Sequence, residues 1–123
     1  MIIRIKNAGA AKKPTVAIPH SQLKMAIAEK LKEHGFVTIV EKRGRKVKKT
    51  IDITLAYKEG GMPRISGVKR ISKPGRRMYA SVKDITPIKY GHGLSMLSTP
   101  KGVLTGDEAR KEKVGGEMMF YIW

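Results

Sequence analysis

The 123 residues of the chain include 26 lysines and arginines against 10 aspartates and glutamates, which gives a formal net charge of +16. Like charges repel one another when such a chain folds, so the composition favours a polyanionic partner, most commonly the phosphate backbone of a nucleic acid. Cysteine is absent, which excludes disulfides and thiolate metal sites, and no stretch approaches the roughly 18 apolar residues of a membrane span.

The positive charge is spread along the whole chain. Residues 1–57 carry 13 basic and 4 acidic residues, and residues 58–123 carry 13 and 6. This is the distribution expected of a protein embedded in nucleic acid rather than tethered to it by a basic tail. Hydrophobic residues make up 41% of the chain, enough for a core. The lack of cysteine fits a reducing compartment without proving one, and the start has no apolar signal-peptide core; the location we expect is cytoplasmic.

The first elements in chain order are two helices with a strand between them. The opening MIIRIKNAGAA is consistent with a short helix, and Thr15–Ile18, set between two prolines, is typical of a strand. In SQLKMAIAEKLKEHG, Ser21 predicts an N-cap and Gly35 the residue just past the C-terminal cap. The helical spacing predicts one buried stripe, made of Leu23, Ala26, Ile27 and Leu31.

Two strands follow, at residues 36–40 and 51–57, the second with alternating apolar side chains. The segment between them, EKRGRKVKKT, predicts a β-hairpin with a cationic tip. We call this tip the cationic finger; phosphate contacts are expected from Lys42, Arg43, Arg45, Lys46, Lys48 and Lys49. A solvated turn without RNA contacts explains the same charge run equally well.

Turn-forming residues without apolar periodicity cluster in KEGGMP, which places a linker at residues 58–63 between lobes at 1–57 and 64–123. The second lobe is expected to contain strands in RISGVKRIS, after the turn in KPGRRMYAS, at residues 94–97 and at residues 118–123, the last of them central. Thr105-Gly106-Asp107-Glu108 predicts a capping box that starts a helix of about two turns, ended by Gly115-Gly116. The fold class is α+β: an N-terminal α-β-α-β-β lobe and a mainly β C-terminal lobe with a short helix.

The patterns of enzymes are weak or missing. Ser98 and Lys101 match the S-x-x-K pattern of some acyl-transfer enzymes, but Ser21 and Ser66 precede lysines at the same spacing and the companion motifs are absent. The three histidines stand at no metal-ligand spacing, and the chain has no Gly-Lys step for a P-loop. We expect no enzyme, no metal, no cofactor and no small-molecule substrate.

Two segments of the second lobe fit RNA. In KPGRRMYAS, Tyr79 can stack on an exposed base while Arg76 and Arg77 bind phosphate, although a tyrosine in a strand is more often a core residue. In LSTPKG, the small hydroxyls of Ser98 and Thr99 can reach 2′-OH groups and base edges in a shallow RNA minor groove. These features indicate binding to structured RNA without naming it.

Five motifs in order along nearly the whole chain resemble the family of the eighth protein of the bacterial small ribosomal subunit. They are RIKNA, SQLKMAIAEKLKEHGF, RISKPGRRMYA, LSTPKGVLTGDEARKEKVGGE and the aromatic C-terminal strand. The resemblance implies two α/β lobes, no catalysis, and primary binding to an irregular helix in the central domain of small-subunit ribosomal RNA, which organises the platform during assembly. It also implies neighbouring small-subunit proteins as partners; we expect a monomer when the protein is free, and no membrane partner.

The resemblance further implies that the C-terminal lobe makes the main RNA contact. Matched position by position, the family's Ser-Thr-Ser-x-Gly loop, its supporting tyrosine and its Gly-Gly-Glu carboxylate correspond here to Ser98, Thr99, Pro100, Lys101, Gly102, Tyr79 and Glu117. Pro100 replaces the loop's second serine and so lacks its hydroxyl and N–H, which removes an RNA contact or stiffens the loop. Relatives also usually have several residues before the position of Met1. The alternative function is a general nucleic-acid-binding basic protein without ribosomal specificity.

Overall fold

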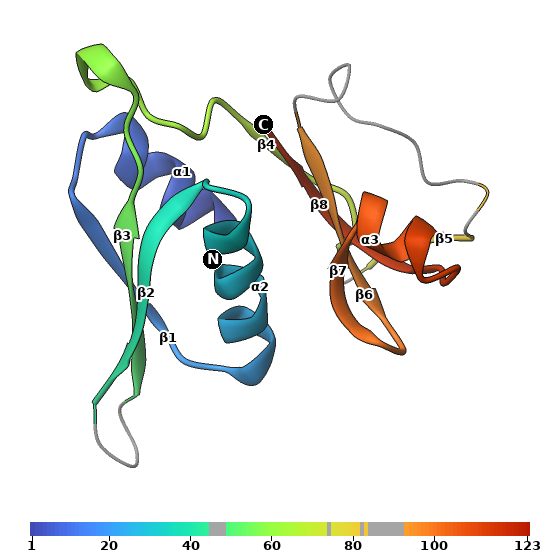
Figure 1. Cartoon of the computed structure of the whole chain (residues 1–123). Helices are drawn as coiled ribbons and strands as arrows, with labels where there is room; N and C mark the ends of the chain where they lie inside the picture. Colours follow the sequence, from blue (N-terminus) through green and yellow to red (C-terminus); the bar gives the residue numbers. More distant parts are fainter. Residues whose placement is uncertain (45–48, 74, 82, 84–92) are drawn as a thin grey trace. The chain divides into compact units, whose positions relative to one another are not determined.

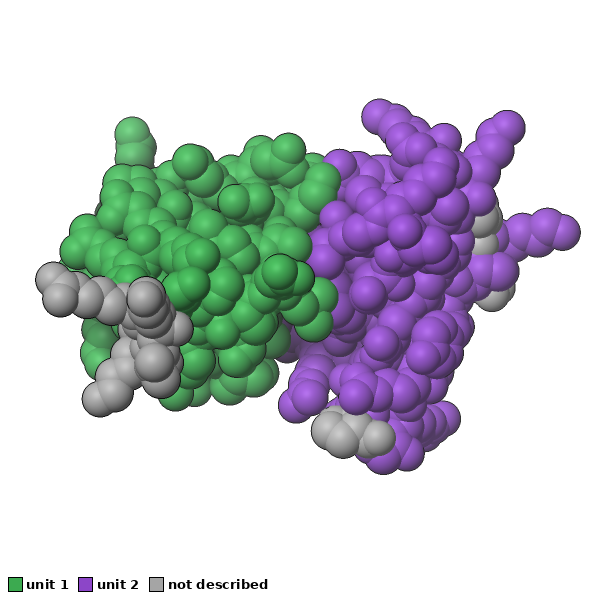
Figure 2. All heavy atoms as spheres, turned by 90° about the horizontal axis from the view of Figure 1, so that it is seen from below, with its two compact units in different colours: residues 1–66 green, residues 67–123 purple. Residues whose placement is uncertain are grey.

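The structure is a computed structural model that describes residues 1–44, 49–73, 75–81, 83 and 93–123 (Figure 1). The chain divides into two compact units, residues 1–66 and 67–123, which Figure 2 shows in different colours. Each unit combines helix with an antiparallel sheet, which confirms the α+β class. No helix in the described part of the chain is long and apolar enough to cross a membrane.

The first unit is a three-stranded sheet covered by two helices, in the predicted order α-β-α-β-β. The sheet is antiparallel with strand order β1-β3-β2, and both helices lie on the same face of it (Figure 1). Fully buried isoleucines and a leucine fill the space between helices and sheet, because alternate residues of β3 point to that face. The elements are α1 (Ile2–Ala10), β1 (Thr15–Pro19), α2 (Gln22–Glu33), β2 (Val37–Arg43) and β3 (Thr50–Leu55).

Both ends of α2 are set by the residues that the sequence singled out. The Ser21 side chain accepts a hydrogen bond from the backbone N–H of Lys24 (3.1 Å), as an N-cap does. Gly35 has φ +79°, and the N–H of Phe36 reaches back to the Leu31 carbonyl (2.9 Å). This pattern is the Schellman motif, which closes the helix through a left-handed residue.

The predicted stripe of α2 is wrong at its first position. Leu23 is 49% exposed, whereas Ala28 is fully buried beside Ile27. The sheet meets α2 along a face rotated toward Ala28, and this direction depends on the packing partner rather than on the helical period. His34 is the C-cap residue and is exposed.

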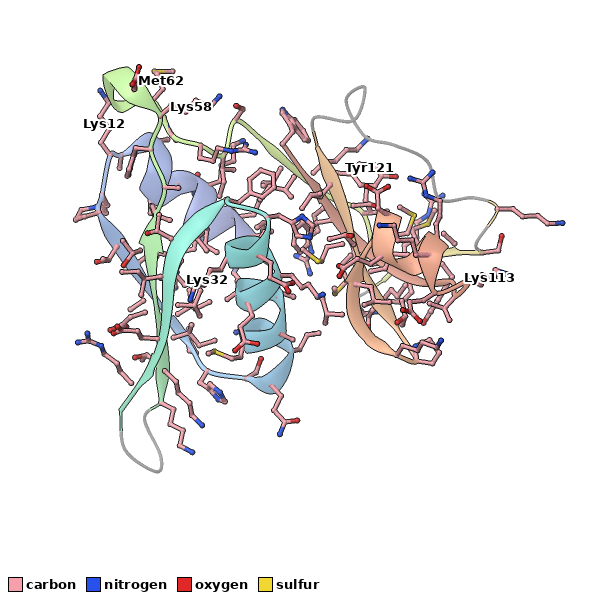
Figure 3. All side chains as sticks on the ribbon, in the orientation of Figure 1. Lys12, Lys32, Lys58, Met62, Lys113 and Tyr121 are labelled. Carbon is pink, nitrogen blue, oxygen red and sulfur yellow. The ribbon has the colours of Figure 1, made fainter. Side chains whose placement is uncertain are left out.

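Residues 58–63, where the sequence placed a linker, lie within the first unit. They form a closed turn containing the 3-10 helix η1 (Glu59–Gly61), in which the Lys58 N–H donates to the Met62 carbonyl (2.7 Å). Tyr57 then pairs with Pro63 across the turn. Lys58 and Met62 project from the turn in Figure 3.

The second unit is a five-stranded sheet with one short helix. Its strands follow the order β4-β8-β6-β7, and β5 also pairs with β8, so the C-terminal strand is central as predicted. The strand β7, which completes a hairpin with β6, was not anticipated. The elements are β4 (Val68–Arg70), β5 (Tyr79–Ala80), β6 (Leu94–Thr99), β7 (Gly102–Thr105), α3 (Gly106–Lys111) and β8 (Gly116–Ile122).

The capping box at the start of α3 is confirmed, but the predicted end of this helix is wrong. The Thr105 hydroxyl accepts from the Glu108 N–H (3.3 Å), and the Glu108 carboxylate accepts from the Thr105 N–H (3.0 Å). The helix ends at Lys111, and Lys113, labelled in Figure 3, takes the left-handed position at φ +56°. The Gly115-Gly116 pair therefore serves a different purpose from ending the helix.

Candidate nucleic-acid interface

Three of the predicted site residues stand side by side in one row across the second sheet. Tyr79 of β5 lies opposite Glu117 of β8, and Glu117 lies opposite Ser98 of β6. Val103 of β7 lies opposite Ser98 and ends the row. Side chains of directly opposed residues point to the same face with Cβ atoms about 4.5–5.5 Å apart. We call these four residues the cross-strand row.

The cross-strand row lies on the face opposite to α3. Ala80, Leu97 and Ala109 form the buried cluster between α3 and the sheet. Because neighbouring residues of a strand point to opposite faces, Tyr79 and Ser98 point away from this cluster. Tyr79 is 73% exposed, so it is not a core residue. Among the described residues, the Ser98 hydroxyl has no hydrogen-bond partner. The cross-strand row therefore presents the ring of Tyr79, the carboxylate of Glu117 and the hydroxyl of Ser98 next to one another on this face.

The turn beyond the row, residues 99–102, is closed by the side chain of Thr99. Its Oγ1 accepts from the Lys101 N–H (3.1 Å) and donates to the Gly102 carbonyl (2.8 Å). Gly102 has φ +105°, which only glycine adopts readily, and Pro100 occupies the second turn position, where its fixed φ is favoured. The hydroxyl proton of Thr99 is thus used inside the turn, and Thr99 offers a ligand only an acceptor.

The carboxylate of Glu117 is held by an ion pair. Arg77 Nη1 lies 3.1 Å from Glu117 Oε2, and the Glu117 side chain is only 21% exposed. Arg77 comes from the turn before β5, where the Ser72 hydroxyl binds both the N–H (2.9 Å) and the carbonyl (3.2 Å) of Met78. Arg77 therefore neutralises the Glu117 carboxylate of the cross-strand row, while the Arg77 side chain itself stays 54% exposed.

Two other predicted cations, Arg76 and Lys101, lie outside the cross-strand row. Arg76 is exposed in the turn that it closes with Lys73, the two residues exchanging backbone hydrogen bonds of 2.9 and 3.0 Å. Lys101 projects from the hairpin tip, where it pairs with Glu112 (3.1 Å), and both side chains are 53% exposed. An ion pair this exposed is weak and can be exchanged for a phosphate.

Gly115 and Gly116 are residues whose role the sequence interpretation missed. A Cβ at Gly116 would lie 2.9 Å from the Ser98 carbonyl carbon, 3.0 Å from Thr99 Cγ2 and closer still to the Ser98 carbonyl oxygen. A Cβ at Gly115 would similarly meet the backbone of Ala80 and Ser81. The glycines allow β8 to lie against its neighbours where the cross-strand row forms. In the sequence, the one feature that could have indicated this role is that the two glycines directly precede Glu117.

The cationic finger belongs to the first unit and is described only in part. Arg45, Lys46 and Lys48 lie outside the described residues, while Lys42 and Lys49 are exposed. Arg43 binds Glu41 (2.8 Å) and Asp52 (3.0 Å), and the hydrogen bond to Glu41, with the charges of both carboxylates, raises the pKa of Arg43 above its usual value. Its guanidinium is thus already paired within the sheet. A phosphate role for the finger stays a prediction.

The whole chain, residues 1–123, matches the family model described as ribosomal protein S8. The small ribosomal subunit protein uS8 of Mycoplasma mobile is 48% identical over 123 residues, which cover 100% of this chain and 92% of the relative. The proteins of the same name from Roseiflexus castenholzii and Chloroflexus aggregans are each 47% identical, covering 100% of this chain and 93% of each relative. The resemblance indicated by the motifs is confirmed.

Proposed function

Because the chain belongs to the ribosomal protein S8 family, we propose that its cross-strand row binds an irregular helix in the central domain of small-subunit ribosomal RNA. The family is structural and non-enzymatic, so the chain is a structural constituent of the small ribosomal subunit and the expectation that it is no enzyme is confirmed. Beyond this family membership, we propose which RNA element the protein binds and which residues bind it. We also propose that it helps to assemble the platform of the subunit, in the cytoplasm.

The observation that carries the proposal is the cross-strand row. An exposed ring at Tyr79 can stack on an unpaired base, and base–aromatic stacking contributes about 1–3 kcal/mol per base. The Ser98 hydroxyl can donate to or accept from a ribose 2′-OH or a base edge. Glu117 can accept a hydrogen bond from a base amino group, since Arg77 offsets its charge. An irregular helix supplies such an unstacked base, and a perfect duplex does not.

The turn at residues 99–102 supports the row rather than extending it. The Thr99 hydroxyl is hydrogen-bonded to the backbone groups of Lys101 and Gly102. Pro100 limits the conformations of the turn in the free protein. Less entropy is then lost when RNA binds, which offsets part of the affinity that a serine hydroxyl at position 100 would supply. The exposed side chains of Lys101 and Arg76 can bind phosphates without reading sequence.

The competing function is general binding of nucleic acid through charge alone. It is favoured by the even distribution of 26 basic residues along the chain. This function requires no particular row on the sheet. It predicts equal binding to all duplexes, with a steep dependence on salt.

A titration with two RNAs separates these functions. One RNA is a hairpin from the central domain with its irregular internal loop, and the other is a fully paired control of equal length, each measured at several salt concentrations. Ser98→Ala is expected to weaken binding of the irregular hairpin by roughly 1–2 kcal/mol, the scale of a lost hydrogen bond whose partner stays buried. Ser66→Ala removes the same hydroxyl from an exposed position of the first unit and should change nothing.

The titration contradicts the proposal if the two RNAs bind equally and lose affinity together as salt rises. It also contradicts the proposal if Ser98→Ala leaves the preference for the irregular hairpin unchanged. In either case charge alone would account for binding, and the row would be a structural feature of the sheet.

A further inference from the structure

In the first unit, one face of the sheet is covered by none of the helices that the structure describes. Helices α1 and α2 lie on the same side of the sheet (Figure 1), against the buried positions Ile51, Ile53 and Leu55 of β3. The opposite face is formed by the odd-numbered residues of β1, by the even-numbered residues of β3 and by residues 39, 41 and 43 of β2, all of which are exposed or half-buried. We call it the open face.

The charge of the open face differs from that of the unit around it. Residues 1–66 contain 15 basic and 5 acidic residues. In the middle row of the open face, Asp52 of β3 stands between Ala17 of β1 and Glu41 of β2. Arg43 is the one cation on these strand positions, so the open face carries a formal charge of −1 within a strongly basic unit.

That one cation is already paired. Arg43 donates to Glu41 through Nε and Nη2 (3.2 and 2.8 Å), and its Nε lies 3.0 Å from Asp52. A phosphate approaching the open face would meet two carboxylates and would have to displace Arg43 from both. RNA backbone is therefore disfavoured on this surface, whereas a cationic side chain can join the carboxylates, which are 49% and 31% exposed.

The remaining residues suit a flat protein contact. They are three threonines, an alanine, a proline and Ile39, which is 47% exposed and stands opposite Thr54. Small and β-branched side chains let a partner approach the sheet closely, and an exposed isoleucine adds apolar area at the rim. The open face combines an apolar, close-packing surface with two acidic acceptors.

We propose that the open face docks a basic segment of a neighbouring protein of the small ribosomal subunit. The inference rests on membership of the ribosomal family and on the charge of this face, and does not depend on the cross-strand row. Protein segments that lie against ribosomal RNA need cationic side chains, which makes them complementary to Glu41 and Asp52. The first unit would thus turn its cationic surfaces to RNA and its acidic face to protein.

A photo-crosslinking amino acid at position 39 tests the proposal in reconstituted small subunits assembled from ribosomal RNA and the complete set of purified proteins. A matched variant carries the same group in place of Lys101, at the hairpin tip of the second unit. After irradiation, the adducts are separated by nuclease and protease treatment and identified by mass spectrometry. Position 39 is expected to give a protein adduct on a lysine- or arginine-rich peptide. Adducts to RNA from position 39, or no adduct while the Lys101 variant crosslinks, would overturn the proposal.

A second pair of variants tests the charge. Glu41→Gln with Asp52→Asn removes both acceptors, while Glu29→Gln with Glu59→Gln makes the same change of charge elsewhere in the first unit. The first pair should reduce the protein adduct several-fold and leave affinity for protein-free ribosomal RNA within twofold of the control pair. A gain in RNA affinity well beyond that of the control pair would mean that the open face contacts RNA, and the proposal would fail even if the row binds RNA as proposed.

Discussion

The substitution Gly116→Ala tests whether close strand approach builds the cross-strand row, the proposed RNA site. The added Cβ would lie 2.9 Å from the Ser98 carbonyl carbon, whereas carbon atoms pack comfortably at about 3.5–4.0 Å. Strands β8 and β6 must therefore separate by roughly 0.6–1 Å at this point. A backbone hydrogen bond that begins near 2.9 Å then exceeds about 3.5 Å and is lost. The separation occurs next to the pair formed by Glu117 and Ser98.

The expected loss of stability follows from this displacement. Two ladder hydrogen bonds contribute about 1 kcal/mol each, and overpacking a tight contact costs about 1–3 kcal/mol. These terms overlap, because strand separation relieves the steric overlap at the expense of the bonds. We therefore expect the free energy of unfolding of the second unit to fall by about 2–3 kcal/mol.

Urea unfolding followed by tryptophan fluorescence measures this loss. Trp123 is the sole tryptophan, and its ring lies over Gly67 within the second unit, so it reports on this unit. With a slope of about 1 kcal/mol per molar urea for a unit this small, the midpoint should fall by about 2 M or more. Gly75→Ala is the matched control, because a Cβ there would meet no atom of the described residues within 4 Å. If the Gly116→Ala midpoint equals that of Gly75→Ala, the strands tolerate a side chain and the explanation of the glycine pair is wrong.

Four further outcomes are expected. Tyr79→Ala should weaken binding of the irregular hairpin by about 1–3 kcal/mol in the titration, while Tyr79→Phe keeps most of the affinity because the ring remains. In thermal melts, Thr105→Ala should lose about 1 kcal/mol more of unfolding free energy than Thr105→Ser, because both variants lose the buried methyl group but only alanine loses the capping box. Thr99→Val should weaken hairpin binding more than Thr99→Ser does, since only serine can close the turn. Lys42→Gln with Lys49→Gln should weaken both RNAs alike and reduce the salt slope by about two.

The sequence by itself determined the features that depend on nearby residues. The N-cap at Ser21, the left-handed Gly35 and the capping box from Thr105 to Glu108 each involve a few consecutive residues, and all three are present in the structure. Strand alternation predicted β3 for the same reason. Ordered motifs along the chain also identified the family, because matches in several segments together exclude chance.

Only the tertiary structure decided how distant segments meet. Tyr79, Ser98 and Glu117 share one face because of the register of three strands, and no local period encodes a register between separate segments. The glycine pair before Glu117 looked like a helix end, and only the approach of the neighbouring strands reveals its role. Likewise, the pairing of Arg43 with two carboxylates, which leaves one acidic face on a basic unit, arises from cross-strand contacts between β2 and β3.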